Sequence, residues 1–292
     1  MHIHIRLGSL GALVAVFVLG FSSVGCGGDG GGPAGGGGNG TIYYSNVDGE
    51  IWQLTLGDGQ IKKLMLGNQP DRTAEGSFVY ERNDLDESSD GVMVKTIVKL
   101  SDSPPGYNNS FSMPRVSPDG MRIAYQSLAN DTYVVTRNGG QLVSSFPLNQ
   151  SSTTGFERPS WTTDGRIVAA GAFSNPGLYI SDAALSTFTR FDPMLSAPSQ
   201  PSVSPDGKRV AFIVNEHVAV MNIDGTGFAQ ITTGNGSESF PSWSPDGTKI
   251  AAWNQYTLMV FNADGTGTAY DVVASHPEIF YNFLTDIPFC WR

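Results

Sequence analysis

A turn sequence that recurs about every forty residues constrains this chain more than any other feature. In each copy a proline is followed six residues later by a glycine, and three copies contain the same Ser-Pro-Asp-Gly tetrapeptide, at 117–120, 204–207 and 244–247. Two weaker copies read Thr-Ala-Glu-Gly at 73–76 and Thr-Thr-Asp-Gly at 162–165. The glycines are 44, 45, 42 and 40 residues apart. This period is the length of one four-stranded β-propeller blade.

The chemistry of the turn explains why the segment repeats. Proline presets the backbone φ angle, aspartate bonds nearby backbone amides, and glycine accepts the positive φ angle of a tight turn. We therefore interpret the aspartates as turn-building residues, not as catalytic or metal-binding groups. The structural turn motif consists of Pro118, Asp119, Gly120, Asp164, Gly165, Pro205, Asp206, Gly207, Pro245, Asp246 and Gly247.

Runs of β-forming residues fill the space between the turns. Residues 210–212 and 250–253 follow a turn glycine directly, and a second run follows each of them at 218–221 and 258–261. A third run and the stretch around each proline bring the count to four strands in each period. Only 15% of the residues are charged and 36 are glycine, which is typical of many short strands joined by tight turns.

The segment 241–251 reads Pro-Ser-Trp-Ser-Pro-Asp-Gly, followed by Thr-Lys-Ile-Ala. It resembles the WD40-like repeat of TolB-type periplasmic propellers, and the resemblance extends over 41–292. It implies the propeller fold and leaves the activity open, because the same repeat occurs in peptidase propellers, in lyases and in many exported proteins.

The two ends of the repeat region complement each other. Residues 41–45 look like the strand after a turn glycine, so the chain begins with a blade that lacks its first strand. Residues 287–291 resemble the missing strand. We therefore predict an all-β fold, a six-bladed β-propeller with four antiparallel strands per blade, closed by a C-terminal strand that joins the N-terminal strands. It spans residues 41–292.

The first forty residues are predicted to lie outside this fold. Arg6, an apolar run at 7–21 and small residues before Cys26 are typical of an export signal. The cysteine after small residues resembles the bacterial lipoprotein box, although Ser23 stands where leucine is usual. We predict a lipoprotein signal peptide at 1–25 and lipid attachment at Cys26; cleavage and secretion without lipid is the alternative.

A glycine-rich flexible tether is predicted at 26–40, since ten of the fourteen residues at 27–40 are glycine and nothing there can form a core. The resemblance implies a protein that is exported and lipid-anchored in the bacterial envelope. Because Gly27 replaces the aspartate that retains such proteins in the inner membrane, it favours the periplasmic side of the outer membrane.

Several other residues are of types that can form a functional site. We expect Cys290 to be a buried apolar residue in a strand and not a reactive thiol. His217, in a loop between strands two and three, and His276 are expected to be isolated surface histidines, with a metal or acid–base pair as the alternative. The acidic residues of one loop are expected to be solvated and not to bind calcium: Asp84, Asp86, Glu87 and Asp90.

Function is less constrained than fold. The net charge of −10 disfavours a nucleic-acid partner, and no nucleophile elbow, zinc-protease motif or phosphate-binding loop occurs. We predict a non-enzymatic, lipid-anchored envelope propeller, monomeric in its body, that binds another envelope protein, with no catalytic residue, cofactor or metal. The alternative is a carbohydrate-active or glycan-binding propeller that uses the mouth of the central channel.

The expected partner surface is the face with irregular loops and not the uniform Asp-Gly face. These loops are 82–91, 101–112, 146–158 and 275–286.

Overall fold

The computed structural model describes residues 39–46, 48–72, 78–81, 111–127, 132–137, 142–146, 155–171, 175–255, 257–275 and 288–292. The chain divides into two compact units, Met1–Ala34 and Gly35–Arg292, and every described residue belongs to the second. Cys26 and nearly all of the predicted tether therefore lie outside the described residues. Within the described part of the chain, no helix has the length and apolar character needed to cross a bilayer.

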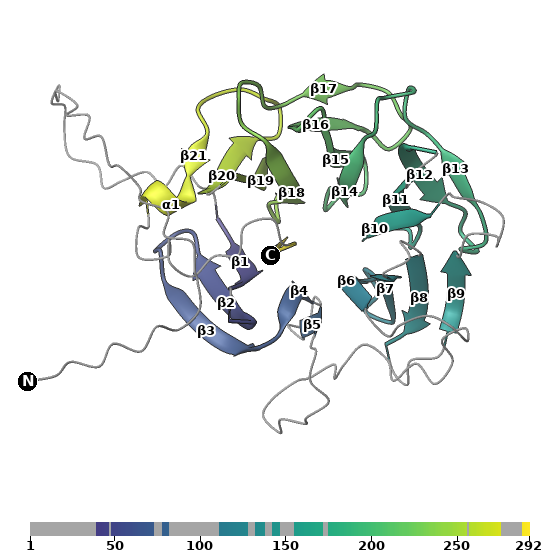
Figure 1. Ribbon diagram of the computed structural model, residues 1–292, viewed down its shortest axis with the longest axis horizontal. Coiled ribbons are helices and arrows are strands. Elements are labelled where there is room, and N and C mark those ends of the chain that lie inside the picture. The colour runs from purple at the N-terminus through teal and green to yellow at the C-terminus, as the bar shows by residue number, and fades with distance from the viewer. Residues whose placement is uncertain are drawn as a thin grey trace, which may run out of the picture. The chain divides into compact units, whose positions relative to one another are not determined.

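The described strands form six antiparallel sheets arranged around a central axis (Figure 1). From the axis outward, the first three are β22 (Cys290–Trp291), β1 (Thr41–Ser45), β2 (Glu50–Thr55) and β3 (Ile61–Leu66); β4 (Asn68–Arg72) and β5 (Phe78–Glu81); and β6 (Phe111–Val116), β7 (Arg122–Ser127), β8 (Thr132–Thr136) and β9 (Leu142–Phe146). The next three are β10 (Phe156–Trp161), β11 (Ile167–Gly171), β12 (Gly177–Ser181) and β13 (Phe188–Arg190); β14 (Ser199–Val203), β15 (Arg209–Val214), β16 (His217–Asn222) and β17 (Ala229–Gln230); and β18 (Glu238–Trp243), β19 (Lys249–Asn254), β20 (Thr257–Asn262) and β21 (Tyr270–Asp271). A four-residue helix, α1 (Val272–Ser275), follows β21.

The prediction of an all-β propeller is confirmed. Five of the six sheets have four strands, and the sheet of β4 and β5 has two within the described residues. Residues 82–110, where further strands of that sheet were predicted, lie outside the described part of the chain. A full set of six four-stranded blades therefore stays a prediction.

The hydrophobic core lies between neighbouring sheets. Each adjacent pair of sheets encloses one buried apolar cluster, and the last cluster joins the sheet of β18–β21 to that of β1, for instance through Trp253 and Trp291. Strands in the middle of a blade are covered on both faces, which explains their continuous apolar runs, such as Val210–Val214 in β15. Each fully buried large side chain contributes about 1.5–3 kcal/mol.

The two ends of the described chain meet in one sheet. β22 pairs with β1 in the register Ile42↔Trp291 and Tyr43↔Cys290. The Thr41 amide donates to the Arg292 carbonyl (2.7 Å), and the Arg292 amide donates back to Thr41 (2.9 Å). Trp291 is 1% exposed, and its indole Nε1 donates to the Asn39 carbonyl (3.1 Å).

The repeated turns share one hydrogen-bond pattern. In the copy at 244–247, the Gly247 amide donates to the Ser244 carbonyl (2.9 Å), and Gly247 has a φ angle of 69°. The Ser244 hydroxyl donates to Asp246 (2.6 Å) and accepts from the Lys249 amide (2.9 Å). Thr162 takes the place of this serine at 162–165, where the turn forms with Thr163 in place of proline. The aspartate and the hydroxyl together provide hydrogen-bond partners for the backbone at the start of the second strand.

Candidate functional site

The innermost strands carry an irregularity that sequence reasoning missed. One residue before its proline, each of β4, β6, β10, β14 and β18 shifts register in a β-bulge. The bulged residues have positive φ angles between 50° and 56° although none is glycine: Gln69, Met113, Arg158, Gln200 and Phe240. A strained backbone position of this kind costs about 1–3 kcal/mol.

Hydrogen bonds from the preceding sheet hold these bulges. The Met113 amide donates to Gln69 Oε1 (2.6 Å), and the Phe240 amide donates to Gln200 Oε1. The Arg158 amide donates to Gln126 Oε1 (3.0 Å). The strained residue of one sheet is thus hydrogen-bonded to a glutamine of the preceding sheet. These strained positions are therefore also points of contact between neighbouring sheets.

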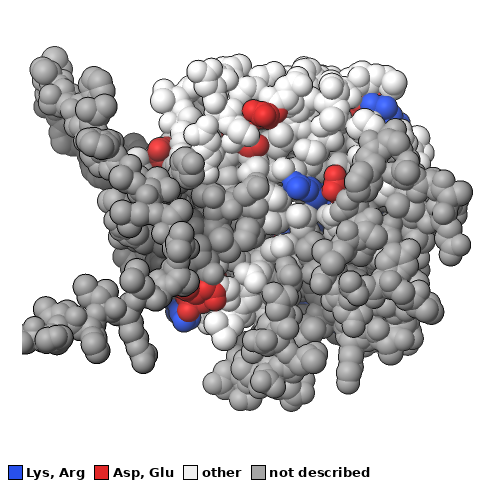
Figure 2. All heavy atoms as spheres, viewed as in Figure 1, with Lys and Arg blue, Asp and Glu red and all other residues white. Residues whose placement is uncertain are grey.

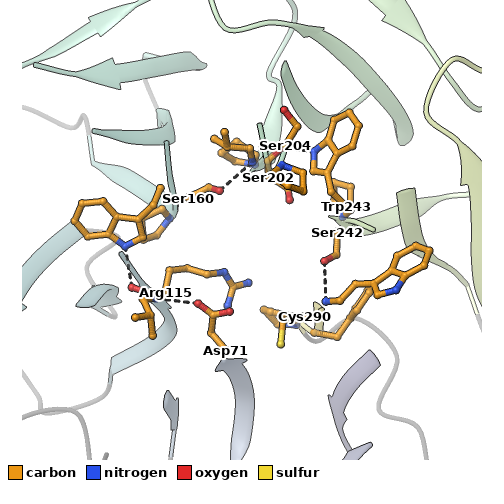
Figure 3. Close-up of a pocket in the computed structure, with 18 of the residues that line it drawn as sticks. Asp71, Arg115, Ser160, Ser202, Ser204, Ser242, Trp243 and Cys290 are labelled. Atoms are coloured by element: carbon orange, nitrogen blue, oxygen red, sulfur yellow. Dashed lines mark hydrogen bonds between the residues drawn. The ribbon is translucent and has the colours of Figure 1, made fainter. Parts of the chain in front are cut away.

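The residue after the proline forms a ring around the axis. Five members are Asp71, Arg115, Ser160, Ser202 and Ser242, and Cys290 takes the sixth place because it precedes Trp291 as Ser242 precedes Trp243. Figure 3 shows these side chains, each contributed by a different sheet.

Members of this ring bond the backbone of the next sheet. Asp71 Oδ2 accepts from the Val116 amide (2.8 Å), and Ser160 Oγ accepts from the Val203 amide (3.0 Å). Ser242 Oγ accepts from the Trp291 amide (3.2 Å). Polar atoms at the centre of the molecule therefore join the sheets to one another.

A cavity of about 410 Å³ lies along the axis. Its lining runs from the bulged residues Met113, Arg158, Gln200 and Phe240, through the ring of post-proline residues, to the Ser-Pro turns at Pro118, Pro205 and Pro245. The volume lies in the range of roughly 300–1,000 Å³ that is usual for ligand pockets. It accommodates a small molecule or a few side chains of a partner.

The charge of the cavity differs from that of the whole protein. Four arginines and one carboxylate residue are among the described residues that line it: Arg72, Arg115, Arg158, Arg292 and Asp71. On the face shown in Figure 2, acidic and basic side chains lie scattered among uncharged residues of the described chain. Four arginines therefore line one cavity of a protein whose net charge is −10.

Cys290 lies in this ring as a buried free thiol, 4% exposed, in β22. Burial raises the pKa of Cys290 to about 12, and the Asp71 carboxylate adds to the rise. The positive charges of Arg292, Arg115 and Arg72 lower the same pKa in part. The thiol is thus protonated at neutral pH and packs as an apolar group.

A second feature missed from sequence lies at the turn end of the sheets. The guanidinium of Arg209 lies 4.6 Å from the ring centre of Trp243 in the next sheet, and it donates to the Gly247 carbonyl (2.8 Å). Arg122 covers Trp161 in the same way at 5.0 Å. The sequence does contain a signal for this contact. An arginine lies two positions after the turn glycine, and a tryptophan lies in the next repeat. Such cation–π pairs contribute about 0.5–2 kcal/mol.

The expectation that His217 is an isolated surface residue in a loop is wrong. His217 is the first residue of β16, and its Nδ1 lies 2.9 Å from Glu238 Oε2. Glu238 is 4% exposed and also accepts from the Thr232 hydroxyl (2.6 Å) and Asn254 Nδ2 (2.8 Å). The sequence placed the second run of this blade at 218–221, one residue later than the observed start of β16; Asn215 and Glu216 form the turn immediately before the strand.

The other candidate residues lie outside the described chain. These are His276, the acidic residues Asp84, Asp86, Glu87 and Asp90, and Cys26. Among the residues that the structure describes, no group of three or more His, Cys, Asp or Glu side chains is placed to hold a metal ion. Most of the irregular loops on which the partner face was predicted are also outside the described ranges.

The carboxylates of the turns are engaged by their own turns. The Ser204 hydroxyl lowers the pKa of Asp206 first, and the Lys208 amide lowers it further. The pKa values of Asp119, Asp164 and Asp246 are lowered in the same way, each chiefly by the turn serine or threonine. These groups are charged at neutral pH and stabilise the turns.

A family model of the lipoprotein LpqB β-propeller domain matches residues 96–279. This chain belongs to that family. The Tol-Pal system protein TolB of Francisella tularensis subsp. tularensis (strain WY96-3418) is 31% identical over 82 residues, which are 25% of this chain and 19% of that protein. TolB of Francisella tularensis subsp. mediasiatica (strain FSC147) matches to the same extent. The match thus spans about a fifth of the length of these curated relatives.

The crystal structure of TolB from Acinetobacter baumannii has the same fold. It aligns with 86% of this chain and 66% of its own, with a TM-score of 0.58 and 19% sequence identity. At this identity the likeness concerns the fold alone. Together with the family match, it confirms the predicted resemblance to TolB-like β-propellers.

Proposed function

We propose that this chain is a non-enzymatic, lipid-anchored propeller of the bacterial envelope that binds another envelope protein. The observation that carries the proposal is the central cavity, whose polar lining is used for structure. Ser160 and Ser242 hold backbone amides of the next sheet, and burial keeps the Cys290 thiol protonated. Such a lining recognises a partner by shape and charge and offers no activated nucleophile at these positions.

The relatives supply the setting of the proposal. The curated relatives are proteins of a Tol-Pal system, and the family model is that of a lipoprotein domain. We propose by analogy a signal peptide at 1–25, acylation of Cys26, a tether at 26–40, and a monomeric ring of six four-stranded blades at 41–292. The protein would be exported and held on the periplasmic side of the outer membrane, without a cofactor or a nucleic-acid partner.

The proposal also includes the end of the cavity at which the partner binds. Its lining extends from the bulged residues Arg158 and Phe240 to Pro118, Pro205 and Pro245, and we propose that the partner enters at the Ser-Pro turns. This differs from the face with irregular loops that the sequence favoured. A photo-crosslinking residue at exposed Thr163, which lines the cavity, compared with one at exposed Glu216 in the β15–β16 turn, distinguishes the two ends.

The experiment is a crosslinking pull-down from native envelope with the crosslinker at Thr163 or, as a control on the outer strand β3, at exposed Lys62. We expect one envelope protein to be captured at Thr163 and not at Lys62. Equal capture at both positions, or none, contradicts binding at the cavity. Mass spectrometry of the mature N-terminus tests the anchor, because an unmodified Cys26 in the membrane fraction would contradict lipidation.

The alternative, a glycan-binding or carbohydrate-active propeller, requires aromatic faces open to sugar rings. The arginines of the neighbouring sheets stack on the indoles of Trp161 and Trp243, at 5.0 and 4.6 Å. Because these faces already have a partner, the described aromatic lining favours protein binding over glycan stacking.

A further inference from the structure

The described lining of the cavity contains more cationic than anionic side chains. Four arginines and one aspartate are among its described lining residues. The single carboxylate residue, Asp71, is 1% exposed, and both of its oxygens are engaged: Oδ2 by the Val116 amide at 2.8 Å and Oδ1 by Arg292 Nη2 at 2.6 Å. Asp71 therefore pairs with Arg292, and no other carboxylate residue is among the described lining residues.

Arg115 lies in the middle of this arrangement. The peptide bond that follows Arg115 is held at both of its polar groups, because the Trp161 indole donates to the Arg115 carbonyl (2.9 Å) and the Val116 amide donates to Asp71. Its side chain projects into the cavity next to Asp71 (Figure 3). Within the described residues, one of its five N–H donors has a hydrogen bond to protein, from Nη1 to the Pro114 carbonyl at 2.9 Å.

The remaining arginines are oriented by aromatic rings. The guanidinium of Arg158 lies 4.9 Å from the ring centre of Phe240, and that of Arg72 lies 5.0 Å from the ring centre of Tyr43. Arg115 is the arginine of the lining that offers hydrogen-bond donors to the cavity. Serine hydroxyls stand on other inner strands of the same ring, at Ser160, Ser202 and Ser242.

We infer that the centre of the cavity is a carboxylate-binding subsite, with Arg115 as its main ligand, and that it receives an acidic side chain of the partner. This inference rests on the proposed protein-binding function and specifies its chemistry. A planar guanidinium pairs with a carboxylate through two parallel hydrogen bonds, and a cavity of about 410 Å³ admits a side chain on a narrow segment but not a folded domain. The acidic exterior does not prevent this, because charges farther away than about 8–10 Å are screened at physiological salt.

The test uses the smallest mimics of an acidic and a neutral side chain in a peptide: N-acetyl-glutamate N-methylamide and its glutamine counterpart. Each is titrated into the exported protein while the side-chain Nε–H resonance of Arg115 is followed by NMR. We expect the glutamate compound to bind at least about tenfold more tightly than the glutamine compound, since a charge-assisted hydrogen bond replaces a neutral one. Arg115→Gln should abolish this preference, and Lys62→Gln, the same charge change on β3, should retain it.

Three results would overturn the inference. They are equal binding of the two compounds, no response of Arg115 to either, and an equal loss of the preference in both variants. A response to inorganic phosphate with none to the glutamate compound would assign the subsite to a free anion and would overturn the acidic side chain as its occupant. The proposed function fails separately: capture at Thr163 that is the same in Arg115→Gln as in the parent protein supports partner binding and refutes the carboxylate contact.

Discussion

Trp291→Ala tests whether the pairing of β22 with β1 closes the ring. Trp291 is 1% exposed and packs in the cluster that joins the sheet of β1 to the sheet of β18–β21. Truncating a buried tryptophan costs about 3–5 kcal/mol, and the lost hydrogen bond from Nε1 to the Asn39 carbonyl (3.1 Å) adds about 1 kcal/mol. Against a total stability of about 5–15 kcal/mol for a typical domain, this is a large fraction.

The effect is measured by guanidinium denaturation followed by far-UV circular dichroism, and by hydrogen exchange of the Thr41 amide. That amide donates to the Arg292 carbonyl at 2.7 Å, so its exchange reports directly on the pairing of the two chain ends. Trp291→Phe retains the aromatic packing and should cost about 1–2 kcal/mol. Trp52→Ala, at a partly buried position of the same sheet, should leave Thr41 protected until global unfolding.

A loss below about 1 kcal/mol for Trp291→Ala would refute the reasoning, because a buried tryptophan in a closed ring must carry packing energy. So would wild-type protection of the Thr41 amide in a clearly destabilised variant, since the two ends would then be held by something other than β22.

Three further predictions concern the turns and the axis. Ser204→Ala removes the hydrogen bond that the hydroxyl donates to Asp206 (2.6 Å) and the one that it accepts from the Arg209 amide (2.9 Å). It should lower the free energy of unfolding in urea by about 1–3 kcal/mol. Thr162→Ser retains the hydroxyl of its turn and should change stability by less than about 0.5 kcal/mol. The native protein should resist iodoacetamide at pH 8 and react after unfolding, because burial raises the pKa of Cys290 to about 12; rapid alkylation of Cys290 in the folded state would contradict its placement. The pKa values of Asp206 and Asp246 are lowered in the folded state, so both carboxylates stabilise the fold. Their contribution to the free energy of unfolding is complete above the unfolded pKa of about 3.9 and is lost as the pH falls below it. The double variant Asp206→Asn/Asp246→Asn should therefore show a shallower loss of stability in a pH titration below about pH 4.

Most of the fold could be predicted from the sequence because it depends on local chemistry. The turn tetrapeptides and the apolar runs that follow them locate the second strand of a blade, and the all-β propeller follows from their period. Residues 287–291 resemble the Pro-x-Trp strand of the other repeats with one extra residue, which suggested a strand beside β1, and β22 is found hydrogen-bonded to β1. These features depend on a few neighbouring residues, so one sequence is enough to show them.

The arrangement at the centre of the molecule could not be predicted in the same way. Gln69 and Phe240 have positive φ angles for which their residue types give no indication, and their amides are hydrogen-bonded to side chains of neighbouring sheets. Arg115 and Asp71 follow prolines as Ser160 does, and only closure of the ring brings them to one cavity. His217 was misplaced because its partner Glu238 lies 21 residues away in another strand. Such sites arise from tertiary contacts and have no local pattern.

The meeting of the two chain ends in one sheet also governs how this protein can fold. The hydrogen bond from Trp291 to Asn39 spans 252 positions, so it closes a very long loop and is expected to form late. Until β22 arrives, β1 has an unpaired inner edge that a second chain can occupy, which is a route to domain swapping and aggregation. Folding therefore has to keep this edge protected until the last five described residues, Pro288 to Arg292, have joined the sheet.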